Sequence, residues 1–197
     1  MVYRIYVEKK PGFDVEANGL KNELTSLLGI KDLTGLRLLN RYDVEGIDEA
    51  LFNQCVSTVF SEPPVDNTYA ELPAAEGVSF AVEYLPGQFD QRAASAVDCV
   101  HLIDPKADVR IKSSKLIILP ADVEDETIAK IKHYFINAVE SREKDLSKLT
   151  DSEAAAVKPV PVLDGFTKMT EADLEPFCRK MGLAMNADDL REVVKYF

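Results

Sequence analysis

One loop of the sequence combines several residue types that could bind a ligand. The segment PGQFDQR at residues 86–92 joins a glycine hinge, two amides, an aromatic ring and an arginine directly before a predicted helix. Backbone N–H groups at a helix N-terminus favour anions, and Arg92 in the first turn could donate to a phosphate or a carboxylate. A structural turn before a capped helix is the more common explanation. The candidate residues for a ligand-binding or interface role are Gly87, Gln88, Phe89, Gln91 and Arg92.

Outside this loop the sequence predicts no catalytic or metal-binding group. The nine glycines are scattered and form no phosphate-binding loop. His101 and His133 lie in predicted helices, and a catalytic cysteine would need a histidine partner. The cysteines at positions 55, 99 and 178 have no zinc-ligand spacing and are interpreted as buried, reduced structural thiols. The acidic residues at 122–126 are typical of the first turn of a helix, whose dipole favours negative charge.

Composition and charge disfavour several classes of partner. With 23 Lys and Arg against 34 Asp and Glu, the net charge of −11 leaves no basic surface for nucleic acid or for an anionic membrane. The longest aliphatic run covers residues 116–119, whereas a membrane-spanning helix needs about 20 residues. The N-terminus has no signal-peptide pattern. We therefore expect a cytoplasmic protein, and a monomer because an internal repeat supplies its own partner.

The order of predicted elements repeats once within residues 1–148. In residues 1–75, strand 2–9 is followed by a helix from Asp14 (apolar stripe at positions 20, 24, 27 and 28), an extended segment 36–44, a helix from Asp48 and a strand 68–72. In residues 76–148, strand 78–85 is followed by a helix from Asp90, two strands 109–111 and 116–119 joined by a hairpin turn at Ser113-Ser114, and a further helix. The pattern predicts an α+β fold of duplicated ferredoxin-like (βαββαβ) halves. They are expected to pack as a pseudo-dimer with their sheet faces buried against each other.

A connector and a small helical linker domain are predicted to follow. Residues 149–164 are rich in Ala and Pro, which indicates an extended linker. In residues 165–197, Thr170 with Asp173 and Asn186 with Asp189 predict the starts of two helices, and Gly182 ends the first. Chains of fewer than about 40 residues seldom fold alone. Because the amphipathic pattern is still continuing at Phe197, we expect a cut from a longer protein.

Several segments resemble one family of enzymes. IYVEKKPGF at residues 5–13 and LPGQFDQRA at residues 85–93 resemble the N-terminal region of the large bacterial phosphoribosylformylglycinamidine synthase (FGAM synthase, or FGAR amidotransferase). DVRIK at 108–112, with the run at 116–119, resembles the small subunit of the multi-subunit form. GLAMNADDL at 182–190 resembles the linker domain that follows it. The resemblance extends over essentially the whole chain, and residues 85–93 are its most specific part.

The resemblance implies a part in purine biosynthesis. Members of the family use ATP, magnesium and glutamine to convert formylglycinamide ribonucleotide to its amidine. Their N-terminal domain is similar to two fused small subunits and precedes a linker, a synthetase core and a glutaminase. The chain would then assemble the synthetase and glutaminase domains of the same full-length protein and help to channel ammonia. It would have no catalytic residue, metal or cofactor of its own, and Cys178 would not be the glutaminase nucleophile. The residues leave open an alternative, a free-standing tandem ferredoxin-like regulatory module that binds a small metabolite.

Overall fold

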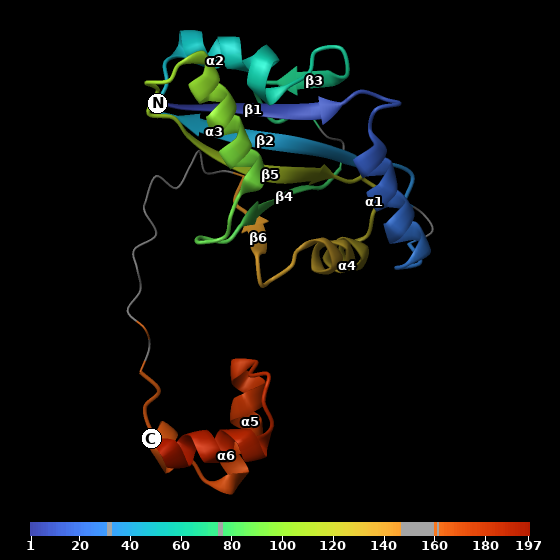
Figure 1. Cartoon of the computed structure of the whole chain (residues 1–197). Helices are drawn as coiled ribbons and strands as arrows, with labels where there is room; N and C mark the ends of the chain where they lie inside the picture. Colours follow the sequence, from blue (N-terminus) through green and yellow to red (C-terminus); the bar gives the residue numbers. More distant parts are fainter. Residues whose placement is uncertain (31–32, 75–76, 147–159, 161) are drawn as a thin grey trace. The chain divides into compact units, whose positions relative to one another are not determined.

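The computed structural model describes residues 1–30, 33–74, 77–146, 160 and 162–197 (Figure 1). The chain divides into two compact units, Met1–Ala155 and Ala156–Phe197. The larger unit is α+β, and the smaller unit is helical. Within the described ranges, no helix is both long and apolar enough to cross a membrane.

The described strands of the larger unit form one antiparallel sheet in the order β3-β1-β2-β5-β4-β6 (Figure 1). Their bounds are β1 (Val2–Lys9), β2 (Arg37–Glu45), β3 (Asp66–Tyr69), β4 (Ser79–Tyr84), β5 (Arg110–Ile118) and β6 (Ser141–Lys144). The long strands β2 and β5 pair at the middle of the sheet, and Arg41 opposite Ser114 is their central pair. Strands β1, β2 and β3 of the first half therefore form one side of the sheet, and β4, β5 and β6 of the second half form the other.

Helices cover one face of this sheet. They are α1 (Val15–Ser26), α2 (Glu49–Cys55), its π-helical continuation η1 (Val56–Phe60), α3 (Gln91–Ile103) and α4 (Asp125–Phe135). The strand residues packed in the helix-bearing cores alternate along each strand, for example Ile5 with Val7 and Phe80 with Val82. This alternation is the period of two that places successive side chains on opposite faces of a strand.

Strand β5 is continuous, so the hairpin turn predicted at Ser113-Ser114 is wrong. Both serines are buried and stand opposite Tyr42 and Arg41 of β2. Ser113 also donates from its backbone N–H and its hydroxyl to the carboxylate of Asp90, both at 2.8 Å. Serine favours turns because it can replace backbone hydrogen bonds. Here β2 and Asp90 supply those bonds, and the strand continues.

Three further expectations from the sequence need correction. Helix α1 ends at Ser26, so Leu27 and Leu28 are exposed, at 69% and 38%, rather than part of the buried stripe. The strand predicted at 68–72 is β3, which covers Asp66–Tyr69. The described strands lie in one sheet, so the prediction of two sheets buried face to face is wrong. A βαββαβ pairing is not confirmed, because the described elements of each half follow the order βαβαβ.

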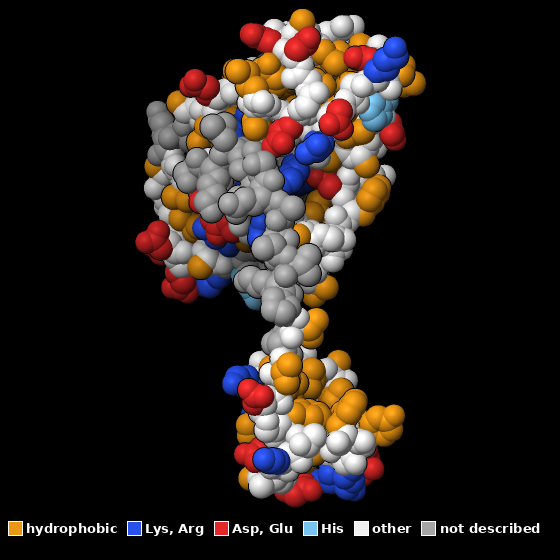
Figure 2. All heavy atoms as spheres, turned by 90° about the vertical axis from the view of Figure 1, so that its left-hand side faces the viewer, with side chains coloured by type: hydrophobic (Ala, Val, Ile, Leu, Met, Phe, Trp, Pro, Cys, Tyr) orange, Lys and Arg blue, Asp and Glu red, His pale blue; other side chains and the backbone are white. Residues whose placement is uncertain are grey.

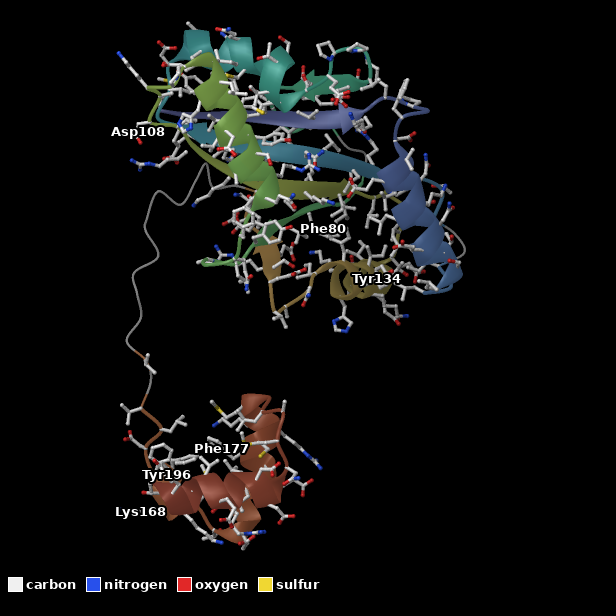
Figure 3. All side chains as sticks on the ribbon, viewed as in Figure 1. Phe80, Asp108, Tyr134, Lys168, Phe177 and Tyr196 are labelled. Atoms are coloured by element: carbon white, nitrogen blue, oxygen red, sulfur yellow. The ribbon has the colours of Figure 1, made fainter. Side chains whose placement is uncertain are left out.

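Each half of the helical layer is completed by a helix from the other half. One core cluster joins residues of β1, β2, α2 and η1 to Ala96 and Val100 of α3. The other joins residues of β4, β5 and α4 to Leu20 and Leu24 of α1. Tyr134 on α4, labelled in Figure 3, donates to a carboxylate oxygen of α1 at 3.2 Å. The helix that follows the first strand of each half therefore packs in the core of the other half.

The opposite face of the sheet carries a buried ion network. Asp43 is 2% exposed, accepts hydrogen bonds from Arg4 Nε at 2.6 Å and Arg41 Nη2 at 3.0 Å, and lies 3.2 Å from Lys144 Nζ. Lys144 also donates to Glu83 at 2.9 Å. Burial alone would raise the pKa of Asp43, but the hydrogen bonds from Arg41 and Arg4 hold it below its ordinary value. The network connects β1, β2, β4 and β6 beside the apolar cluster of Tyr6, Leu39, Ala81, Leu116 and Ile118.

The smaller unit consists of η2 (Phe166–Lys168), α5 (Glu171–Met181) and α6 (Ala187–Tyr196). Both predicted helix starts are confirmed, since each forms a capping box, Thr170 with Asp173 and Asn186 with Asp189. Gly182 ends α5 with φ +62°, a left-handed conformation that glycine adopts easily.

The core of this unit is small. Its described buried side chains are Leu174, Cys178 and Leu190, against which Phe177 is partly buried (Figure 3). Figure 2 shows hydrophobic side chains on its surface, and the exposed ones include Met181 and Tyr196. So few buried side chains indicate a unit of low intrinsic stability.

Candidate functional site

The loop between β4 and α3 turns sharply and then starts a firmly capped helix. Gly87 has φ +92°, and the backbone N–H of Gln88 donates to the carbonyl of Leu85 at 3.0 Å. Asp90 accepts from the backbone N–H of Ala93 at 2.9 Å, which caps α3. The same carboxylate holds Ser113 of β5. The loop is therefore held in place where α3 begins, and the side chains that precede Asp90 are not held by these contacts.

The five predicted site residues separate into two groups. Phe89 is 74% exposed, and Gln91 is also exposed. Gln88 donates from Nε2 to the carbonyl of Val139 at 3.4 Å, at the edge of the loop. Arg92 extends in another direction, because its Nη1 donates to the hydroxyl of Tyr42 on β2 at 3.3 Å. The structure therefore does not gather these five side chains into one site.

Arg92 lines a cleft on the helix-bearing side of the sheet. The cleft measures about 410 Å³ and lies over β1 and β2, between the start of α1 and the segment from η1 to β3. Its polar lining includes Lys9, Asn40, Tyr42, Asp66 and Arg92. Its apolar lining is Val7, Phe13, Ala17, Leu38, Val59 and Phe60. A volume of this size is within the usual range for small-molecule sites.

One wall of the cleft is the π-helix η1, whose turns are wider than those of an α-helix. Two side chains of this region donate hydrogen bonds to backbone carbonyl groups of the same segment. Thr58 donates to the carbonyl of Gln54 at 2.8 Å, and Ser61 donates to that of Val56 at 2.6 Å. The corresponding helix of the other half, α4, is an ordinary α-helix. Single-turn π segments are rare and occur often at functional sites.

Several charged groups of the cleft have partners of opposite charge. Lys9 pairs with Asp66 at 2.9 Å, and Asp66 also accepts the backbone N–H of Glu62 at 2.8 Å. Glu16 pairs with Lys115 on β5. Arg92, in contrast, forms no ion pair with any residue in the described parts of the chain, and its hydrogen bond goes to a phenol hydroxyl.

The electrostatic surroundings keep Arg92 charged. Burial by itself would lower the pKa of Arg92, but the hydrogen bond to Tyr42 and the nearby carboxylates of Glu16 and Asp90 raise it above its ordinary value. Arg92 is thus a cation with donor capacity to spare, held at the start of a helix. The cleft could accommodate the anionic group of a small ligand at this point.

The other candidate groups of the sequence have structural surroundings. His101 Nε2 lies 3.1 Å from the carbonyl of Ala107, at the end of α3. Cys55 and Cys178 are buried free thiols. Cys99 is also a free thiol but is exposed, so the expectation that it is buried is wrong, because Ala93, Ala96 and Val100 form the buried face of α3. Among the residues that the structure describes, no group of His, Cys, Asp and Glu could hold a metal ion.

Sequence reasoning found Arg92 but missed the residues that surround it. Asn40 and Tyr42 lie on a strand whose hydrophobic alternation gave no sign of a cleft, and Lys9 closes the first strand. Their convergence depends on the crossing of α3 over β2, which links residues 50 positions apart. The unusual wall at η1 also has no sequence signature that we recognise.

Comparison with models of known protein families gives no match to this chain. No curated protein sequence matches it either.

Proposed function

We propose that the chain is the N-terminal portion of an FGAM synthase, a glutamine-dependent ligase of purine biosynthesis. One observation carries the proposal. The two segments that resemble the family, residues 5–13 and 85–93, occupy equivalent places in the fold. Each leaves the first strand of its half and passes a glycine of positive φ, Gly12 or Gly87, at the end of a Pro-Gly pair. Each then reaches an aspartate at the N-cap of the following helix, Asp14 or Asp90.

A duplicated, pseudo-dimeric origin of the two halves belongs to the same proposal. The strand order β3-β1-β2 is mirrored by β6-β4-β5. Strand β5 begins 73 residues after β2, at positions 110 and 37, and β6 begins 75 residues after β3, at positions 141 and 66. The contacts of α1 with β5 through Glu16 and of α3 with β2 through Arg92 are also reciprocal. Two small subunits fused end to end would produce this arrangement.

In this function the chain assembles other domains rather than performing chemistry. Its partners are the synthetase and glutaminase domains of the same full-length protein, which would supply the ATP and magnesium sites. The exposed side of the β4–α3 loop, with Phe89 and Gln91, is suited to an interface, because aromatic residues are favoured in protein contacts. We propose that this side faces those domains near the path of ammonia. A cytoplasmic, monomeric chain is part of the proposal.

Reconstitution tests the proposed function. The synthetase and glutaminase domains of the enzyme from the same source are produced without their N-terminal region, and this chain is added as a separate polypeptide. We expect ATP- and glutamine-dependent formation of the amidine only when both are present, and no hydrolysis of ATP or glutamine by the chain alone. Failure of the chain to bind those domains or to restore activity would refute the assignment.

A loop variant localises the role. Phe89→Ala removes an exposed side chain that contacts no core cluster, so the chain should fold normally and bind the other domains less tightly. Rates measured with glutamine and with ammonia separate two cases. A loss confined to glutamine indicates the ammonia path, and equal losses indicate assembly. Leu102→Ala, at a position 85% exposed on α3, is the matched control and should have no effect.

The second candidate function is a regulatory module that binds a small metabolite. The cleft beside Arg92 is the observation that favours it. A pocket of this size, whose arginine pairs with no carboxylate of the described residues, needs no other domain to bind a ligand. A purified chain that binds a metabolite but fails the reconstitution would support this function over the first.

A further inference from the structure

We propose that the cleft beside Arg92 binds a small zwitterion, an apolar α-amino acid, with its carboxylate on Arg92 and its ammonium on Asn40. The inference concerns the cleft itself and does not rest on the proposed role in purine biosynthesis. It follows from the polar groups at the two ends of the cleft, Arg92 with Tyr42 and Asn40, and from the charged residues of the cleft lining.

The carboxylate end is formed by Arg92 and Tyr42. Arg92 uses one Nη1 hydrogen bond on the Tyr42 hydroxyl, which accepts it and keeps its own proton available for donation. A ligand carboxylate can accept from the guanidinium and from the phenol together. Charge-assisted bonds of this kind are about twice as strong as neutral ones. Since no described carboxylate pairs with Arg92, the ligand displaces no ion pair of the protein.

The ammonium end is formed by Asn40, two residues before Tyr42 on the same face of β2. Asn40 Oδ1 is buried and has no hydrogen-bond partner among the described groups. A buried acceptor without a donor is costly, and the terminal torsion of asparagine is broad enough to turn this oxygen toward the cleft. The Cα atoms of two residues that are two positions apart on a strand lie about 7 Å from each other. Side chains that start this close on one face can both contact a small ligand whose carboxylate and ammonium are joined by one carbon.

The charge of the lining selects a zwitterion over a simple anion. Lys9 and Arg92 are the basic residues of the lining, whereas Asp14, Glu16, Glu62 and Asp66 are acidic. A phosphate or a dicarboxylate would meet this acidic surround and be repelled. The ammonium group of a zwitterion is attracted by these carboxylates.

Part of the remaining cleft lining is hydrocarbon. The apolar lining includes Val59 and Phe60 of η1 and also Phe13, which is 54% exposed. Burying an aliphatic side chain there removes apolar surface from water. An amino acid with a branched aliphatic side chain therefore fits both ends and the wall between them.

Titration with three matched compounds tests the proposal. Backbone amide resonances of the full chain are followed while L-leucine, isocaproate (which lacks the ammonium) or isoamylamine (which lacks the carboxylate) is added. We expect saturable shifts with L-leucine at residues 58–62 and 92, and binding at least about tenfold weaker for the other two compounds. Inorganic phosphate should produce no saturable shift at these residues.

Variants of the chain locate the site. Arg92→Met should weaken L-leucine binding about tenfold or more, and Tyr42→Phe should weaken it less. Arg110→Met removes an arginine that is exposed and far along β5, and it should bind as the wild type does. Since Arg92 is at the surface, its variant should keep the wild-type spectrum outside the cleft. The proposal is overturned if L-leucine gives no saturable shift up to about 50 mM, if the shifts lie elsewhere, or if Arg92→Met binds as tightly as the wild type. Equal binding of isocaproate, or tight binding of phosphate, would also overturn it. None of these results bears on the reconstitution of FGAM synthase activity.

Discussion

Replacement of Asp43 by asparagine should destabilise the larger unit more than any surface change. The carboxylate is buried and faces Arg4, Arg41 and Lys144 within 3.2 Å. Asp43→Asn keeps the size and shape of the side chain but removes the negative charge that these three cations share. Breaking a buried ion pair by removing one partner costs about 3–5 kcal/mol. For a unit of this size, that corresponds to a fall in Tm of about 6–20 °C.

Thermal unfolding as a function of pH measures the effect. The pKa of Asp43 is lower in the folded chain than in the unfolded chain. Its stabilisation is therefore fully present above the unfolded pKa, near pH 4, and is lost as the pH falls through the lower folded pKa. The difference in Tm between the wild type and Asp43→Asn should be large and constant at neutral pH and should shrink below about pH 4.

A surface carboxylate provides the control. Glu126 pairs with Lys130 on α4 at 2.8 Å, and both side chains are mostly exposed. Glu126→Gln should leave the Tm unchanged within the scatter of the measurement, since exposed pairs contribute little. The reasoning would be refuted by an Asp43→Asn variant that unfolds within about 2 °C of the wild type at neutral pH.

Three further predictions concern single groups. Gly77→Ala should destabilise the chain, because a Cβ at Gly77 would lie 2.0 Å from a carbonyl oxygen. Gly19→Ala, in open space on α1, should raise the free energy of unfolding in urea by up to about 1 kcal/mol. A stabilising Gly77→Ala together with a destabilising Gly19→Ala would contradict the packing described. Asp90→Ala should cost more than Asp48→Ala in the same assay, since both cap a helix but Asp90 also holds β5; equal losses would show that the β5 contact contributes nothing. Cys99 alone should react with a thiol reagent in the folded chain, and all three thiols after unfolding; fast reaction of a buried thiol would indicate local opening.

The element types were largely predictable from the sequence, because the helix and strand signals are local. The capping pairs at Thr170 and Asn186 located both helices of the smaller unit correctly. The errors arose where tertiary contacts decided the outcome. Ser113 has the composition of a turn, and only its pairing with β2 and Asp90 makes it part of a strand.

The candidate site was predictable in one residue and not in its surroundings. A helix N-terminus with Arg92 indicates an anion-binding position wherever it lies. The direction in which Arg92 extends depends on the packing of α3 over β2, which no local pattern encodes. Asn40 and Tyr42 therefore became visible as site residues only in the folded chain.

The exchange of α1 and α3 between the two cores has a consequence for synthesis on the ribosome. Strands β1 and β2 are complete at residue 45, but their core lacks α3 until residue 103 has been added. At about 5–20 residues per second, this delay lasts roughly 3–12 s. The packing of helix α1 is completed later still, because most of its buried partners lie on β4, β5 and α4. The nascent first half therefore exposes its apolar strands while most of the larger unit is being translated, and a chain that stalls before α3 should be a substrate for chaperones and proteases.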